Sequence, residues 1–217
     1  MGFDGFPDEA LIFYEGLLAD NSKTYWTEHK DVYERAIKTP MLALIAELGD
    51  SWGEPKVFRP YRDVRFSADK SPYKTHQGAF CEILDGVGYY VQLDADGLTT
   101  GAGFHAHTRE QTARYRAAVD SPATGPQLAK LVTSLVDNGF ELSGDQVKTR
   151  PRGVAADHPR LALMRHESLV ARRHHEPSPS LHTAAAAAVV RADWHALAPL
   201  VEWVATYVGE FTMPPRR

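Results

Sequence analysis

The sequence has little of what cross-links, anchors or exports a protein. Its 217 residues include a single cysteine, Cys81, which excludes an intramolecular disulfide and fits a reducing compartment. No apolar run approaches the roughly 20 residues that a membrane helix needs. The first residues carry neither the basic stretch nor the apolar core of a signal peptide. We therefore expect a cytoplasmic protein that does not bind membranes.

The familiar catalytic and cofactor motifs are also missing. The chain has no P-loop, no Rossmann glycine fingerprint, no G-x-S-x-G elbow and no kinase set. The pairs His105/His107 and His174/His175 lack the further ligands of a zinc site, so we predict no bound metal. No nucleophile and base can be paired from their spacing. The sequence thus leaves open whether the protein is an enzyme, and any cofactor is unknown.

Positive charge is not in excess either. The 24 lysines and arginines against 28 aspartates and glutamates give a formal net charge of −4, which argues against a nucleic-acid or membrane-surface partner. The hydrophobic share of 43% is ordinary for a globular protein. This length favours one domain over residues 1–217. The oligomeric state cannot be read from the sequence.

Hydrophobic periodicity predicts helices first and strands next. Residues 1–50 carry apolar side chains at helical spacing, and we expect Pro40 to end or kink the second helix near Thr39. From Val57 the period changes to two, which predicts strands at about 57–66, 76–84, 88–94 and 98–106. Their short connections require antiparallel pairing.

Residues 108–210 mix helix and strand patterns. We predict helices over 108–119 and 122–138, a strand pair within 140–149, a short helix over 161–166 and a strand over 168–174. Two further helices, 180–191 and 192–207, end the pattern. The predicted fold is α+β, with an antiparallel β meander packed against N-terminal and C-terminal helices.

The most informative segment is 58–76, which reads F-R-P-Y-R-D-V-R-F-S-A-D-K-S-P-Y-K-T-H. Five of its residues are cations, and such density needs counter-charges from the protein or from a bound anion. We predict that they bind a phosphate- or carboxylate-bearing small molecule, with possible hydrolytic or transfer chemistry. The cations are Arg59, Arg62, Arg65, Lys70 and Lys74, and the candidates for proton transfer are Asp63 and His76.

A second positive region lies later in the chain. Arg150, Arg152 and His158 occur in loops rich in glycine and proline, where functional side chains are often placed. If these loops fold over the basic segment, the two regions form one cationic cleft. We therefore include these three residues among the candidate ligand-binding residues.

Two other interpretations remain open. In the first, the basic segment is a structural salt-bridge lattice in which Asp63 and Asp69 pair with the cations and join the sheet to the helices. In the second, it belongs to a non-catalytic module that grips an acidic protein segment or a nucleic-acid backbone. Steep loss of affinity with salt would favour the second.

The string from Phe58 to His76 resembles the hallmark of the family catalogued as domain of unknown function 2461. Weaker similarities follow in the expected order, at 3–7, 21–30, 88–91, 101–103 and 150–159. The chain departs from the family pattern at Pro60, where an aliphatic residue is usual, and at Phe104, where a proline is frequent. The resemblance implies the domain but supplies no activity.

Overall fold

The computed structural model describes residues 2–65, 68–106 and 108–209, and its fold is α+β, as predicted. Phe66, Ser67 and His107, which belong to segments discussed above, lie outside the described residues. Within the described ranges, no helix combines the length and the apolar character needed to cross a membrane.

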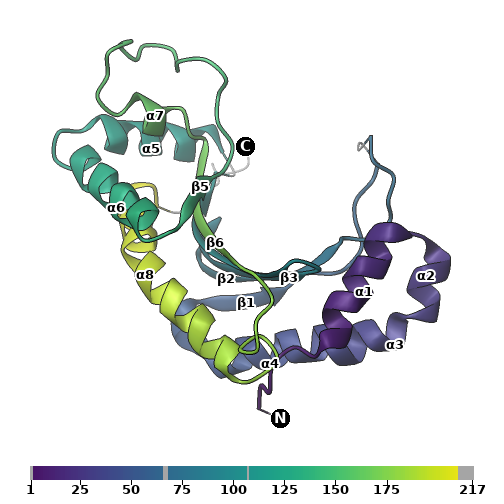
Figure 1. Cartoon of the computed structure of the whole chain (residues 1–217). Helices are drawn as coiled ribbons and strands as arrows, with labels where there is room; N and C mark the ends of the chain where they lie inside the picture. The colour runs from purple at the N-terminus through teal and green to yellow at the C-terminus, as the bar shows by residue number, and fades with distance from the viewer. Residues whose placement is uncertain (1, 66–67, 107, 210–217) are drawn as a thin grey trace, which may run out of the picture. The chain divides into compact units, whose positions relative to one another are not determined.

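Helices form most of the first 48 residues (Figure 1). Helix α1 begins after Pro7, with two acids in its first turn, and helix α2 is capped by the hydroxyl of Ser22, which accepts from the Tyr25 amide at 3.1 Å. Helical turns continue through Pro40, and the hydrogen-bond pattern changes from π to α at Thr39. The elements are α1 Asp8–Ala19, α2 Lys23–Glu28, α3 Lys30–Val32, the π-helix η1 Tyr33–Lys38 and α4 Thr39–Leu48.

Among the described residues, six strands form one antiparallel sheet in the order β1-β2-β3-β4-β6-β5. Strands β2, β3 and β4 follow one another along the chain and confirm the predicted meander, because short turns join them. The 3₁₀ helix η2 Asp50–Trp52 precedes the first strand. The strands are β1 Glu54–Val57, β2 His76–Leu84, β3 Val87–Asp94, β4 Gly97–His105, β5 Glu141–Ser143 and β6 Ser168–His175.

Two predicted strand assignments are wrong. The strand expected over 57–66 ends at Val57, because Pro60 on one arm of the following loop and Pro72 on the other cannot donate to a ladder. The pair expected within 140–149 does not form a local hairpin. Instead β5 pairs with β6, and Leu142 lies opposite Ala171.

The remaining helices are α5 Arg109–Asp120, α6 Gly125–Asp137, α7 Leu161–Met164 and α8 Ala185–Tyr207. The prediction of two separate C-terminal helices is wrong, since α8 runs unbroken through Ala192. No glycine or proline lies near that position to end a helix, and Pro199 is accommodated farther along.

The chain divides into two compact units. The first comprises Met1–Cys81, Tyr90–Thr100 and His174–Ala192, and the second comprises Glu82–Tyr89, Gly101–Arg173 and Asp193–Arg217. Each unit buries large aromatic side chains, such as Phe6 and Tyr14 in the first and Phe104, Tyr115 and Trp194 in the second. The prediction of a single domain stays a prediction.

Candidate functional site

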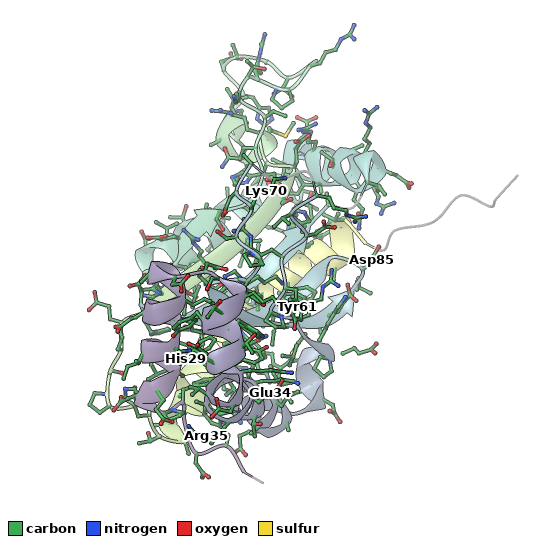
Figure 2. The ribbon with its side chains drawn as sticks, turned by 90° about the vertical axis from the view of Figure 1, so that its right-hand side faces the viewer. His29, Glu34, Arg35, Tyr61, Lys70 and Asp85 are labelled. Carbon is green, nitrogen blue, oxygen red and sulfur yellow. The ribbon has the colours of Figure 1, made fainter. Side chains whose placement is uncertain are left out.

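The described residues of the basic segment, 58–65 and 68–75, form an irregular connection between β1 and β2 in the first unit, which we call the basic loop. Its two arms meet at an antiparallel bridge between Tyr61 and Tyr73. The Arg62 amide donates to the Pro72 carbonyl at 2.9 Å, and the Lys74 amide donates to the Pro60 carbonyl at 2.8 Å. Figure 2 marks Tyr61 near this bridge and Lys70 farther out along the loop. The arms are thus held by two main-chain hydrogen bonds beside the bridge.

The base of the basic loop is fastened to the N-terminal helices. Asn21 hydrogen-bonds both main-chain groups of Tyr73: its amide donates to the carbonyl at 3.0 Å, and its oxygen accepts from the N–H at 3.1 Å. The Tyr73 ring stacks on Trp26 with centroids 4.3 Å apart and planes 7° from parallel. In an antiparallel bridge, alternate residues face opposite sides. Arg62 and Lys74 therefore lie on the face opposite Tyr61 and Tyr73.

Three of the five predicted cations are held by the loop itself. Arg65 forms a bidentate pair with Asp63, and its closest nitrogen–oxygen distance is 2.6 Å. Arg62 pairs with Asp69, and the ammonium of Lys70 donates to the Val64 carbonyl at 3.0 Å. These contacts are those expected of a structural lattice, and they lie within the loop instead of joining sheet to helix.

The two aspartates of the loop, Asp63 and Asp69, are ionised and hydrogen-bonded in these ion pairs. Hydrogen bonds from Arg65 hold the pKa of Asp63 below its ordinary value. The pKa of Asp69 is lowered by hydrogen bonds from Ser71 and from Arg62. A carboxylate with a lowered pKa is a weaker base, so Asp63 is less suited to accept a proton than an ordinary aspartate.

Arg59 and Lys74 differ from the other loop cations. Neither forms an ion pair with a carboxylate among the residues that the structure describes. Arg59 is exposed, whereas Lys74 is half-buried with its ammonium 5.1 Å from the centroid of the Phe58 ring. Burial and the charge of Arg59 lower the pKa of Lys74. A bound anion would relieve this cost, because its negative charge would compensate the half-buried ammonium.

His76 opens β2 next to these cations and is half-buried. Burial lowers the pKa of its imidazole first, and the charges of Lys74 and Arg62 lower it further, while Asp94 opposes the shift. The imidazole is therefore neutral at neutral pH. A neutral imidazole beside cations is a proton acceptor that becomes more basic when an anion binds.

Sequence reasoning missed a row of polar side chains on β3. The Tyr90 hydroxyl donates to the Gln92 side-chain oxygen at 2.8 Å, and the Gln92 amide donates to Asp94 at 2.8 Å. The centroids of the Tyr90 and Phe58 rings are 6.3 Å apart. Burial raises the pKa of the Tyr90 hydroxyl to about 12. The signal was present in the period-two alternation of 88–94, which places Tyr90, Gln92 and Asp94 on one face.

The later candidates belong to the second unit. His158 lies 3.1 Å from an Asp120 carboxylate oxygen, and its other ring nitrogen accepts from the Arg160 amide at 3.1 Å. Arg150 and Arg152 are exposed and have no ion pair within the described ranges. A joint cleft with the basic loop remains a prediction. No group of three or more histidine, cysteine, aspartate or glutamate residues suited to a metal ion occurs in the part of the chain that the structure describes.

Comparison with known proteins identifies a family. Residues 9–203 match the family model described as "Conserved hypothetical protein (DUF2461)", where DUF2461 denotes domain of unknown function 2461. No curated protein and no solved structure matches the chain.

Proposed function

The chain belongs to the domain of unknown function 2461 family, whose model covers residues 9–203, and from this premise we propose that it binds a phosphate- or carboxylate-bearing small molecule at the basic loop. The observation that carries the proposal is the contrast between the loop cations. Three are satisfied by contacts within the loop, whereas Arg59 and Lys74 have no carboxylate partner among the described residues. An ammonium that is partly desolvated and unpaired favours an anionic ligand.

In this proposal the cations have different roles. Lys74 and Arg59 contact the anion, and Arg62 adds positive charge on the face that it shares with Lys74. Arg65 and Lys70 keep the shape of the loop through Asp63 and the Val64 carbonyl. All five predicted cations keep a role, but only Lys74 and Arg59 are assigned to direct contact with the ligand.

His76 is the proton acceptor that we assign to any transfer or hydrolytic reaction at this site. Its neutral imidazole can take a proton from water or from a ligand hydroxyl, and Asp94 stabilises the resulting cation. Asp63 is engaged by Arg65, so we give it a structural role. The ligand is a cytoplasmic small molecule, in keeping with the buried, unpaired thiol of Cys81.

The test is titration calorimetry at low salt with inorganic phosphate, a sugar phosphate, a nucleotide and a dicarboxylate. We expect one class to bind, and we expect Lys74→Met and Arg59→Gln each to weaken it by about tenfold or more, because each removes a charge-assisted contact. Lys30→Met is the matched control, since Lys30 is an exposed lysine on α3 in the same unit.

Three outcomes would overturn the proposal. One is the absence of heat from every probe, and another is binding that survives both Lys74→Met and Arg59→Gln. The third is an equal loss in Lys30→Met, which would indicate non-specific attraction. Selective binding of a polyanion with a steep salt dependence would instead support the nucleic-acid-backbone alternative.

A further inference from the structure

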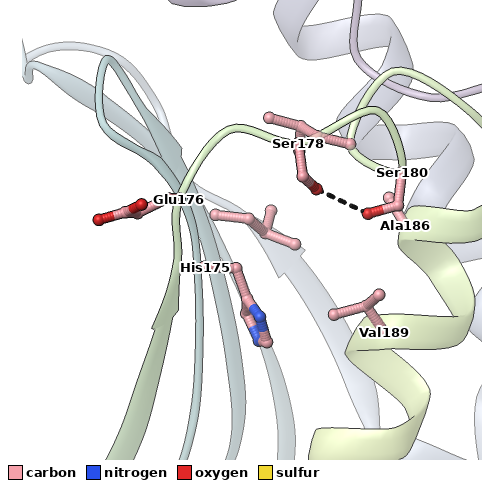
Figure 3. Close-up of a pocket in the computed structure, with 8 residues that line it drawn as sticks. His175, Glu176, Ser178, Ser180, Ala186 and Val189 are labelled. Carbon is pink, nitrogen blue, oxygen red and sulfur yellow. Dashed lines mark hydrogen bonds between the residues drawn. The ribbon is translucent and has the colours of Figure 1, made fainter.

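A separate cavity of about 250 Å³ lies within the first unit (Figure 3). Its walls come from the start of β4, the end of β6, the segment after β6 and the first turns of α8. This volume equals that of roughly eight liquid water molecules, so the cavity suits a small molecule. None of the cavity-lining residues belongs to the basic loop.

The inner wall of the cavity is apolar. Leu98, Leu181 and Ala186 are buried, with exposed fractions of 2%, 4% and 1%, and Val189 adds a half-buried isopropyl group. Such a wall favours the aliphatic body of a ligand, because burying apolar surface there removes it from water. No phenylalanine, tyrosine or tryptophan is among the residues that line the cavity.

The opening of the cavity is polar and uncharged apart from one acid. Ser178 and Ser180 share a hydrogen bond of 2.8 Å between their hydroxyls, so the pair keeps one hydroxyl donor and acceptor lone pairs for a ligand. Figure 3 shows His175 directed toward Val189, whereas Glu176 points to the other side of the strand. No lysine or arginine is among the residues lining the cavity, which disfavours a carboxylate.

The main chain around the cavity is fixed by close contacts. The amide of Phe6 donates to the Leu181 carbonyl at 2.9 Å, and the His182 ring lies 2.8 Å from the Phe6 carbonyl oxygen. Gly97, at φ +127°, passes so near His175 that a Cβ would lie 2.2 Å from the His175 carbonyl oxygen. These contacts preform the cavity, and a preformed site costs less ordering on binding.

We propose that this cavity binds a small neutral molecule that has an aliphatic body and a hydroxyl group. The body lies against Leu98, Leu181 and Val189. The hydroxyl both donates to and accepts from the Ser178–Ser180 pair. A charged head group is disfavoured because no oppositely charged side chain is directed into the cavity.

The test uses cyclohexanol as the probe and follows the methyl resonances of the protein by NMR. We expect saturable shifts at the methyls of Leu98, Leu181 and Val189, and much weaker binding of cyclohexanecarboxylate and cyclohexylamine. Val189→Phe fills the cavity and should abolish these shifts. Ala188→Phe is the matched control, because Ala188 is exposed on the same helix, and it should bind as the wild type does.

A second variant keeps the test independent of folding defects. Ser178→Ala with Ser180→Ala removes both hydroxyls from exposed or half-exposed positions, and we expect affinity to fall about tenfold or more from the loss of two hydrogen bonds. The proposal is overturned if the cavity methyls do not shift, if Val189→Phe folds and still binds, or if the serine double variant binds as the wild type does.

Discussion

Asn21 and Tyr73 lie 52 residues apart in sequence, yet the Asn21 side chain hydrogen-bonds both the N–H and the C=O of Tyr73. A side-chain amide presents a donor and an acceptor in the same arrangement as a strand edge. It therefore replaces the ladder partner that the tyrosine lacks on that side. Through this contact the helices of the first unit position the arm of the basic loop that carries Lys74.

Replacing Asn21 should destabilise the protein without changing its charge. We expect Asn21→Ala to lower the free energy of unfolding by about 2 kcal/mol, since two hydrogen bonds of roughly 1 kcal/mol each are lost. Urea denaturation followed by circular dichroism measures this. Lys23→Ala, at an exposed neighbour, is the control and should change stability little. If Asn21→Ala leaves the free energy of unfolding unchanged, the stacking of Tyr73 on Trp26 is enough to hold this arm of the loop.

Breaking the Arg65–Asp63 pair should have little effect on stability. Both side chains are well exposed, at 77% and 47%, and exposed ion pairs contribute less than about 1 kcal/mol. We expect Arg65→Ala to shift the denaturation midpoint only slightly. If Arg65→Ala unfolds the protein instead, the structural-lattice interpretation gains strong support.

His76 makes stability depend on pH in a predictable direction. Its folded-state pKa lies below the ordinary value of about 6.5, so the unfolded chain takes up the proton first as the pH falls. Protonation of His76 therefore leaves the stability unchanged well above about pH 6.5. The stability decreases as the pH drops from about 6.5 to the folded-state pKa. Burial likewise lowers the pKa of His166, which adds to the same loss.

The variant His76→Gln isolates this contribution. Between about pH 7.5 and pH 5 it should lose less stability than the wild type, because only the His166 part of the loss remains. Denaturation curves at several pH values test this, and NMR titration of the His76 ring gives its pKa directly. A ring pKa at or above the ordinary value would contradict the prediction.

Gly78 should not tolerate even alanine. A Cβ at this position would lie 2.5 Å from the Tyr90 hydroxyl oxygen and 2.9 Å from a ring carbon. We expect Gly78→Ala to cost about 1–3 kcal/mol in the free energy of unfolding, as overpacking does. The double variant Gly78→Ala/Tyr90→Phe should recover part of the loss, because the nearest atom is gone. No recovery would show that the remaining ring carbons of residue 90, and not the hydroxyl, cause most of the clash.

Cys81 should be inert in the native protein. It is buried in β2, and burial raises the pKa of its thiol to about 11. The reactive thiolate is therefore scarce at neutral pH. We expect labelling by iodoacetamide to be slow in buffer and fast in denaturant. Rapid labelling of folded protein would indicate that this part of the sheet opens readily.

Much of the fold could be predicted from the sequence because local patterns agreed with tertiary structure. The alternation in 76–105 and the turns at Asp85-Gly86 and Asp94-Ala95-Asp96-Gly97 predicted three strands nearly to the residue. The pairing of β5 with β6 could not be predicted in this way. Its partners, such as Leu142 and Ala171, are distant in sequence, and local periodicity carries no information about such pairs.

The sequence predicted which charged residues gather at the candidate site, but not which of them form ion pairs with one another. The density of charge indicated the basic loop, yet alternation could not show which cations pair. Arg65 reaches Asp63 two residues away, and Arg62 reaches Asp69 across the turn, because the chain leaves extended geometry after Val57. Only the three-dimensional path of the chain distinguishes Arg59 and Lys74 from the other cations.

The division of the chain into interleaved units has a consequence for biosynthesis. Each unit draws on three separate stretches of sequence, and the first is completed only by His174–Ala192. Phe6 near the N-terminus hydrogen-bonds Leu181 in that last stretch. During translation part of the apolar surface of the N-terminal helices therefore stays exposed until most of the chain has left the ribosome. Truncation after β4 should accordingly yield a chain dependent on chaperones and prone to aggregate, even though it retains the whole basic loop.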